Sequence, residues 1–310
     1  MIEARGLTKR YGDRLAVDQL SFTVKPGQVT GFLGPNGAGK STTMRMILAL
    51  DAPTAGTVTV DGMDYRRLAN PMRVVGALLD AKSVHGGRTA AKHLLCLAQT
   101  NNLPAKRVPQ VLELVGLTQV AGKRIGGFSL GMCQRLGIAA ALLGDPKVLM
   151  FDEPVNGLDP EGILWIRNLM RALAAEGRTI FVSSHLMSEM ENTADHLIVI
   201  GQGRLIADCT VEEFIQRNSE LAVRVRTPAA AQLAGLVTAN GGTARPDGQD
   251  TLLVTGLPQD RVGDLAFDNG IRLHELAPLQ ASLEQAFMEL TRDSVEFHAA
   301  VPTSTIGATS

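Results

Sequence analysis

The sequence is poor in cysteine, in net charge and in long apolar segments. Its 310 residues include three cysteines, Cys96, Cys133 and Cys209, which lie far apart and form no CxxC pair. This spacing argues against a zinc site or a disulfide framework and fits a reducing cytoplasm. The formal net charge of −1 offers no general attraction to nucleic acid or anionic lipid, and no basic run supplies a local one. We therefore expect no nucleic-acid partner.

No segment approaches the roughly 20 consecutive apolar residues that a membrane-crossing helix needs. The first residues, MIEARGLTKRYGDR, contain no apolar stretch of the kind found in a signal peptide. We expect a chain that is not exported and does not span a membrane by itself. With 45% hydrophobic and 20% charged residues, it can form a well-buried core and more than one domain.

The most informative segment is the glycine-rich loop GPNGAGKST, which lies between an apolar strand at residues 29–33 and a helix expected at 42–50. Glycines let successive N–H groups point inward, and the helix that follows presents its positive end to a phosphate. Lys40 would add a charge for the β- and γ-phosphates, and Ser41 a hydroxyl for Mg²⁺. The residues expected to cradle the phosphates are Gly34, Pro35, Asn36, Gly37, Ala38, Gly39, Lys40, Ser41 and Thr42.

Two adjacent carboxylates follow a second apolar strand, in the run VLMFDEP at residues 148–154. Hydrolysis of a nucleoside triphosphate needs a metal held against the phosphates and a group that aligns or deprotonates water. Asp152 would hold Mg²⁺, and Glu153 would activate the water. These residues predict an ATPase that uses ATP and Mg²⁺.

The pattern along the chain predicts a parallel sheet with a β-rich lobe before it and helices inserted into it. Short strands are expected at 3–8 and 16–24, and apolar core strands at 29–33, 74–79, 148–151, 179–183 and 196–200. Helical spacing dominates residues 88–143, and a further helix is expected at 160–176. Beyond residue 208, weaker signals predict a second, small α+β domain, with strands at 221–226, 251–255 and 273–276 and helices near 229–240, 259–269 and 279–291.

Five segments in order resemble the ATP-binding subunit of an ABC transporter: the phosphate loop, the segment FSLGMCQRLG, the two acids, NGLD at 156–159 and SSH at 183–185. The resemblance covers residues 1 to about 215. It implies an α/β P-loop NTPase of the ABC ATPase type, with a RecA-like parallel core sheet, an antiparallel β lobe and an inserted helical subdomain at about 80–144. A small α+β domain at 216–293, for dimerisation or regulation, and a disordered tail at 294–310 complete the expected organisation.

The resemblance also implies roles for residues outside the phosphate loop. Tyr11 matches an aromatic position that stacks on adenine, and Val17 would pack beside it. Ser129 and Gly131 match the core of the family signature, which closes over the γ-phosphate bound by a second copy. Asp159 would cross the dimer seam, and His185 would contact the γ-phosphate as a catalytic residue.

Two departures from the family pattern stand out. Asp80 occupies the place of a glutamine after the third core strand, and an ionised carboxylate there could hold Mg²⁺ through water but could not donate a hydrogen bond. The signature reads FSLGM, with Leu130 and Met132 where many members have Gly and Gln. Together these variants resemble the Gram-positive multidrug and antibiotic export branch.

The resemblance implies a motor that works as a head-to-tail homodimer with separate permease subunits at the cytoplasmic face of the membrane, exporting a drug-like or lipid-like substrate. The alternative is a soluble ABC-type ATPase that acts on ribosomes or DNA, a class with tandem nucleotide domains, a long coiled-coil insertion or basic surfaces. A P-loop kinase or GTPase ranks last, because it would leave the signature segment without a role. The substrate and the permease cannot be deduced from the residues.

Overall fold

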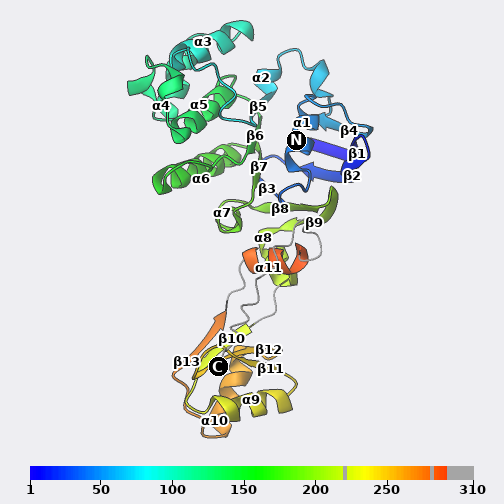
Figure 1. Cartoon of the computed structure of the whole chain (residues 1–310), viewed down its shortest axis with the longest axis vertical. Coiled ribbons are helices and arrows are strands. Elements are labelled where there is room, and N and C mark those ends of the chain that lie inside the picture. The colour runs from blue at the N-terminus through cyan, green and yellow to red at the C-terminus, as the bar shows by residue number, and fades with distance from the viewer. Residues whose placement is uncertain (219–221, 280–282, 292–310) are drawn as a thin grey trace, which may run out of the picture. The chain divides into compact units, whose positions relative to one another are not determined.

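The computed structural model describes residues 1–218, 222–279 and 283–291, which form two compact units, Met1–Thr210 and Val211–Leu290 (Figure 1). The sequence places the division after residue 215, because it does not predict the short helix α8 (Val211–Asn218) at the start of the second unit. The final helix, α11, spans Leu283–Thr291. The tail predicted at 294–310 lies outside the described residues.

An antiparallel lobe opens the first unit. Its strands are β1 (Ile2–Tyr11), β2 (Arg14–Val24) and β4 (Ala55–Val60), in the order β2-β1-β4. Apolar side chains recur at alternate positions of β1 and β2, as expected for a sheet with one buried face. The lobe confirms the predicted β-rich segment before the nucleotide loop.

A six-stranded sheet forms the core of the first unit. Its strands are β3 (Val29–Leu33), β5 (Val75–Leu78), β6 (Val148–Asp152), β7 (Thr179–Ser184), β8 (His196–Gly201) and β9 (Arg204–Thr210), in the order β5-β6-β7-β3-β8-β9. The first five in that order are parallel and β9 is antiparallel. Strands β3 and β7 are buried along their whole length, which explains why their sequences lack the polar–apolar alternation of a half-exposed strand. Parallel strands bring their carboxyl ends to one edge, where β3, β6 and β7 deliver the residues of the site.

The helices of the first unit are α1 (Lys40–Ile47), α2 (Pro71–Val74), α3 (Ala90–Thr100), α4 (Arg107–Leu114), α5 (Leu130–Leu142), α6 (Pro160–Ala175) and α7 (Met187–Glu191), with 3-10 turns at Tyr65–Arg67, Thr118–Val120 and Ile125–Gly127. Helices α3, α4 and α5 pack on one another as the predicted helical insertion, and α5 also packs on β5 (Figure 1). The insertion is thus fixed to the edge of the core sheet through α5.

Three phenylalanines join the lobe to the core sheet. The ring centroids of Phe22 and Phe32 lie 5.8 Å apart, those of Phe22 and Phe181 5.8 Å, and those of Phe32 and Phe181 5.0 Å. All three side chains are buried within one apolar cluster that spans both sheets. Aromatic burial of this extent fixes the lobe rigidly against the strand that leads into the phosphate loop.

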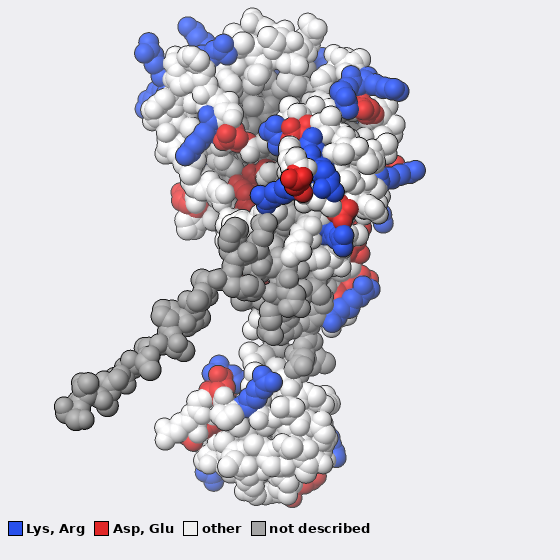
Figure 2. Space-filling view, turned by 45° about the vertical axis from the view of Figure 1, so that its right-hand side comes forward, with Lys and Arg blue, Asp and Glu red and all other residues white. Residues whose placement is uncertain are grey.

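The second unit has a βαββαβ order with its own core. Its further elements are β10 (Ala222–Arg226), α9 (Ala230–Ala239), β11 (Thr243–Pro246), β12 (Thr251–Thr255), α10 (Gln259–Asp268) and β13 (Glu275–Leu279), and its sheet order is β11-β12-β10-β13. Apolar residues of α9 and α10 pack on the strands in one cluster. Residues 227–244 contain no Asp, Glu, Lys or Arg, and Figure 2 shows a broad uncharged area on the visible face of this unit.

Several elements differ from the sequence expectation. Strands β9 and β11 are not predicted, because β9 is mixed in sequence and mostly exposed or half-buried, and β11 is short and mostly exposed. The sequence ends a strand at residue 276 and begins a helix at 279, whereas β13 continues to Leu279 through Pro278. Proline is tolerated there because β13 is an edge strand. Among the described residues, no helix is both long and apolar enough to span a membrane.

Candidate active site

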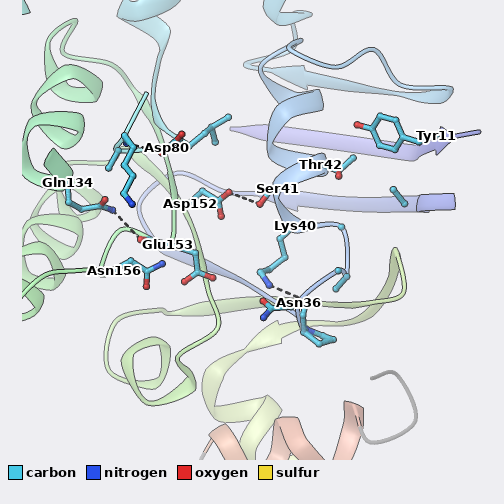
Figure 3. Close-up of a pocket in the computed structure, with 18 of the residues that line it drawn as sticks. Tyr11, Asn36, Lys40, Ser41, Thr42, Asp80, Gln134, Asp152, Glu153 and Asn156 are labelled. Atoms are coloured by element: carbon cyan, nitrogen blue, oxygen red, sulfur yellow. Dashed lines mark hydrogen bonds between the residues drawn. The ribbon is translucent and has the colours of Figure 1, made fainter. Parts of the chain in front are cut away.

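A cavity of about 770 Å³ lies at the carboxyl edge of the core sheet (Figure 3). The phosphate loop and the start of α1 form one wall, and the ends of β5 and β6 with the start of α5 form the other. The lining residues are Tyr11, Arg14, Ala16, Pro35, Asn36, Gly37, Ala38, Gly39, Lys40, Ser41, Thr42, Leu79, Asp80, Ala81, Lys82, Leu130, Gln134, Asp152, Glu153 and Asn156. The cavity therefore gathers most of the residues that the sequence assigns to ATP and Mg²⁺.

The phosphate loop is held in a conformation that only glycine adopts easily. Gly39 has φ +103°, and a Cβ atom there would lie 2.5 Å from the Ala16 carbonyl oxygen and 3.2 Å from Val17 Cγ2. Helix α1 begins directly after Gly39 with no side-chain cap. Its first N–H groups are left for a ligand beside the cavity, which is the arrangement that binds phosphate.

Lys40 reaches back over its own loop. Its Nζ donates to the carbonyl oxygens of Gly34 at 2.6 Å and Pro35 at 3.3 Å, and the residue is only 8% exposed. Burial lowers the pKa of Lys40 below that of an ordinary lysine, and the nearby carboxylates of Glu153 and Asp152 partly oppose this effect. A phosphate group would offer this ammonium a better partner than two carbonyl dipoles.

The donor set for Mg²⁺ is small and fits that ion. Ser41 Oγ donates to Asp152 Oδ2 at 2.7 Å (Figure 3), and Ser183 Oγ donates to the other carboxylate oxygen. Within the described residues there is no cluster of three or more side chains of the metal-binding type. Mg²⁺ usually takes one or two protein oxygens and completes its shell with phosphates and water. Ser41 and Asp152 match that requirement.

Glu153 is in a strained conformation at the end of β6. Its φ is +51°, a left-handed value that is uncommon outside glycine. Its N–H donates to the carbonyl oxygen and the hydroxyl of Ser183, at 3.2 and 3.1 Å, and its carboxylate lies 2.7 Å from His185 Nδ1. The carboxylate therefore lies at the cavity wall, next to His185 and across from Lys40.

The Tyr11 ring lies in the cavity wall beyond the phosphate loop. Its hydroxyl donates to Asp51 at 2.9 Å, and Lys9 Nζ lies 4.8 Å from the ring centroid. Desolvation and the Asp51 carboxylate raise the pKa of Tyr11. Val17, predicted to pack beside it, is fully buried in the core, and its neighbour Ala16 lines the cavity instead. Successive residues of β2 point to opposite faces, so only one of the two can line the site.

Asp80 lines the cavity, but its carboxylate is committed to its own loop. Its two oxygens accept from the Lys82 N–H and the Ser83 hydroxyl, each at 2.8 Å. These two bonds, with the charge of Lys82, lower the pKa of Asp80, so the group is ionised at neutral pH. An ionised carboxylate there supplies negative charge and no hydrogen-bond donor.

Ser129, Gly131 and Asp159 lie beside the cavity, not in its wall. Ser129 caps α5, accepting from Met132 N–H at 3.2 Å, and Asp159 caps α6, accepting from Gly162 N–H at 2.9 Å. Leu130 reaches the wall and covers Gly157, where a Cβ atom would lie 2.4 Å from Leu130 Cδ2. The segments around Ser129 and Asp159 are thus packed together within one chain.

Helix α5 also contacts α6 directly. The Arg135 guanidinium lies 4.6 Å from the ring centroid of Trp165 and donates to the Val115 carbonyl oxygen at 3.2 Å. This cation–π contact and hydrogen bond fix the middle of α5 to two neighbouring segments.

Sequence reasoning assigned no role to Gln134, Asn156 or Ser183 beyond their place in a motif. Gln134 and Asn156 line the cavity, and Ser183 bonds both Asp152 and Glu153. Gln134 could have been found from the helical period, since it lies four residues after Leu130 on the same face of α5. Nothing in the local sequence shows that Ser183 on β7 lies beside Asp152 on β6.

The described geometry agrees with known families. The ABC transporter family model matches residues 17–156, and a model described as a domain of unknown function matches 221–284. A model described as "AAA domain, putative AbiEii toxin, Type IV TA system" matches 122–191. The second unit thus has relatives whose role is not named.

Similar proteins match nearly the whole chain. A bacitracin transport ATP-binding protein of Bacillus licheniformis is 36% identical over 94% of this chain and 97% of its own length. A Nod factor export ATP-binding protein of Burkholderia orbicola is 36% identical over 94% and 96%. A solved ATP-binding subunit of an ABC transporter matches with a TM-score of 0.65 and 26% identity, over 70% of this chain and 92% of its own. The chain belongs to the family of ABC transporter ATP-binding proteins, which bind and hydrolyse ATP.

Proposed function

We propose that this ATPase drives export of a drug-like or lipid-like substrate, as a head-to-tail homodimer bound to separate permease subunits at the cytoplasmic face of the membrane. The observation that supports a dimer is that the residues expected to contact ATP fall into two separate groups. Lys40, Asp152 and Glu153 surround one cavity, whereas Ser129 and Gly131 lie outside its wall. A site that uses both sets needs the Ser129 segment of a second copy.

In each half-site, the N–H groups of residues 34–42 and the Lys40 ammonium hold the phosphates. The adenine stacks on Tyr11, whose ring is fixed by the Asp51 hydrogen bond. Ser41 and Asp152 hold Mg²⁺, which when bound neutralises charge on the phosphates. Asp80 keeps a negative charge at the rim of the site and would reach the ion only through water.

Hydrolysis places a water between Glu153 and the γ-phosphate. The water oxygen attacks phosphorus, its proton passes to the Glu153 carboxylate, and the bond to the bridging oxygen of ADP breaks. His185 orients that carboxylate through the 2.7 Å contact. Ser129 and Gly131 of the second copy stabilise the γ-phosphate, and Asp159 contacts the facing loop. Release of the cleaved γ-phosphate, which both copies contact, then loosens the dimer and drives the permease.

The export role rests on what the relatives are named for. One is named for bacitracin transport and another for Nod factor export. Both names are those of ATP-binding proteins that act in transport or export. Among its described residues, the second unit contains no group of three or more His, Cys, Asp or Glu side chains that could hold a metal ion. We assign this unit, which has its own apolar core, to stabilising or regulating the dimer.

Gel filtration of Glu153→Gln tests the dimer. With ATP and Mg²⁺ the variant should elute as a dimer, because binding survives while water activation is lost. Glu113→Gln, an exposed glutamate on α4, is the control and should behave as wild type. An ATP-loaded variant that stays monomeric would refute the composite site.

Co-purification of the tagged chain from membranes of its source cell, followed by mass spectrometry, tests the permease. We expect a membrane protein of the transporter to be retained in detergent. Recovery of ribosomal proteins or DNA instead would favour the soluble ABC-type ATPase.

A further inference from the structure

The backbone of Glu153 is held by hydrogen bonds at both its N–H group and its carbonyl oxygen. On one side its N–H donates to Ser183; on the other its carbonyl oxygen accepts from Gln134 Nε2 at 3.1 Å and from Asn156 N–H at 3.2 Å. Figure 3 shows the Gln134 side chain reaching across the cavity wall to this carbonyl. Gln134 is thus the side chain that holds this face of the peptide.

The Gln134 bond is sheltered from water and bears on a strained residue. Gln134 is 4% exposed, the only glutamine among the buried polar residues of the described chain. A hydrogen bond in such surroundings is stronger than in water, and losing it leaves a carbonyl partly unsatisfied. Because Glu153 has φ +51°, its conformation persists only while its surroundings enforce it.

Gln134 belongs to the helix that begins at the signature serine. Leu130, four residues earlier on the same face of α5, packs on Gly157 at the other end of the loop that starts at Glu153. Helix α5 therefore contacts this loop at two points, through the Gln134 hydrogen bond and through the apolar packing of Leu130. A shift of α5 along or about its axis would move both contacts together.

We infer that Gln134 is a positioning residue for hydrolysis: its amide fixes the Glu153 peptide and so ties the direction of the Glu153 carboxylate to helix α5. The inference rests on the proposed role of Glu153. Gln134 takes no part in the chemistry; it links the helical insertion to the residue that activates water.

Gln134→Met tests this inference, because Met has a similar length and no N–H donor. We expect kcat for ATP to fall about tenfold to a hundredfold, the scale of a small misplacement of a catalytic group. The KM for ATP and the affinity for a non-hydrolysable analogue should stay within about twofold of wild type, since the phosphate loop is untouched. Gln99→Met, exposed on α3, is the matched control.

Gln134→Glu gives a second readout, should Gln134→Met fold poorly. An ionised Glu at this position repels the carbonyl, whereas its protonated form can donate to it. The ratio of variant to wild-type kcat should therefore rise as pH falls from 8 to 5.5. The charged and titratable groups near this position, Asp152, Glu153, His185 and Lys82, are the same in both proteins, so the ratio removes their effect to first order.

A folded Gln134→Met with wild-type kcat would overturn the inference, as would a raised KM with unchanged kcat or a flat ratio for Gln134→Glu. Failure of the proposed function has a different signature. In that case wild type itself would not hydrolyse ATP, or Glu153→Gln would keep full activity.

Discussion

Helices α1 and α5 both begin at segments assigned to phosphate binding, but their first turns differ. Helix α1 starts at Gly39 with no side-chain cap, so its N–H groups remain for a ligand. Helix α5 is capped by Ser129, whose hydroxyl oxygen accepts from Met132 N–H and whose proton can still be donated to a phosphate. The start of α1 thus offers N–H groups to a phosphate, and the start of α5 offers a hydroxyl proton on an oriented side chain. This pairing suits two copies that face each other.

Ser129→Arg should have the largest effect on this pairing. An Arg side chain at the start of α5 would obstruct the facing cavity, so hydrolysis should fall by more than about a hundredfold, the scale of losing a main stabilising contact. ATP binding to the monomer should remain, because the uncapped end of α1 is unchanged. An ATPase assay beside a binding titration measures both.

Thr118→Arg, at an exposed position of the same insertion, is its control and should keep full activity. Full hydrolysis by Ser129→Arg would show that this segment does not face a nucleotide.

Lys40→Ala should impair the phosphate-binding start of α1. Loss of a charge-assisted contact should weaken ATP binding about tenfold to a hundredfold. Isothermal titration with ATP measures the change, and Lys147→Ala, an exposed lysine outside this cavity, serves as control. Equal affinities in Lys40→Ala and wild type would exclude Lys40 from phosphate binding.

Gly157→Ala should disturb the packing of Gly157 against Leu130, the first residue of α5. A methyl group would collide with Leu130, and φ +76° is unfavourable for alanine. We expect a loss of about 1–3 kcal/mol in the free energy of unfolding, measured by urea denaturation. Adding Leu130→Ala should recover part of that loss; strictly additive effects would mean that the two residues are not coupled.

The smallest effect concerns pH. Burial lowers the pKa of Lys40 in the absence of nucleotide, and the ammonium is the form that attracts phosphate. The affinity for ATP should therefore be highest below that pKa and should decline as pH rises through it. This decline should occur at a lower pH than it would for an ordinary lysine. Titrations between pH 7 and 10 should show this decline, and Lys40→Arg should abolish it. A flat wild-type profile would contradict the charge assignment.

The sequence predicts the chemistry of the site better than its internal connections. The loop at 34–42, the two acids and the strand before each are identified because local spacing encodes them, and the structure brings them to one cavity. Contacts between strands or helices distant in sequence, such as Ser183 with Asp152 or Gln134 with Glu153, have no local signature. They emerge only when the parallel order of β6 and β7 is known.

The same reasoning explains the errors in the fold. Strands β3 and β7 are fully buried and contain no charged residue, so they are predicted almost to the residue. The edge strands β9 and β11 are half exposed and mixed in sequence, and Pro278 reads as a break although β13 tolerates it. Val17 was misplaced because only the register of β2 decides which neighbour faces the cavity.

The contact between Arg135 and Trp165 has a practical consequence. Trp165 is the single tryptophan in the chain, so its emission is not mixed with that of another indole. The emission of an indole changes with the charge and polarity near its ring, and here the Arg135 guanidinium of α5 lies 4.6 Å from the ring centroid. The native protein thus contains an optical probe of signature-helix movement, one that needs no attached dye.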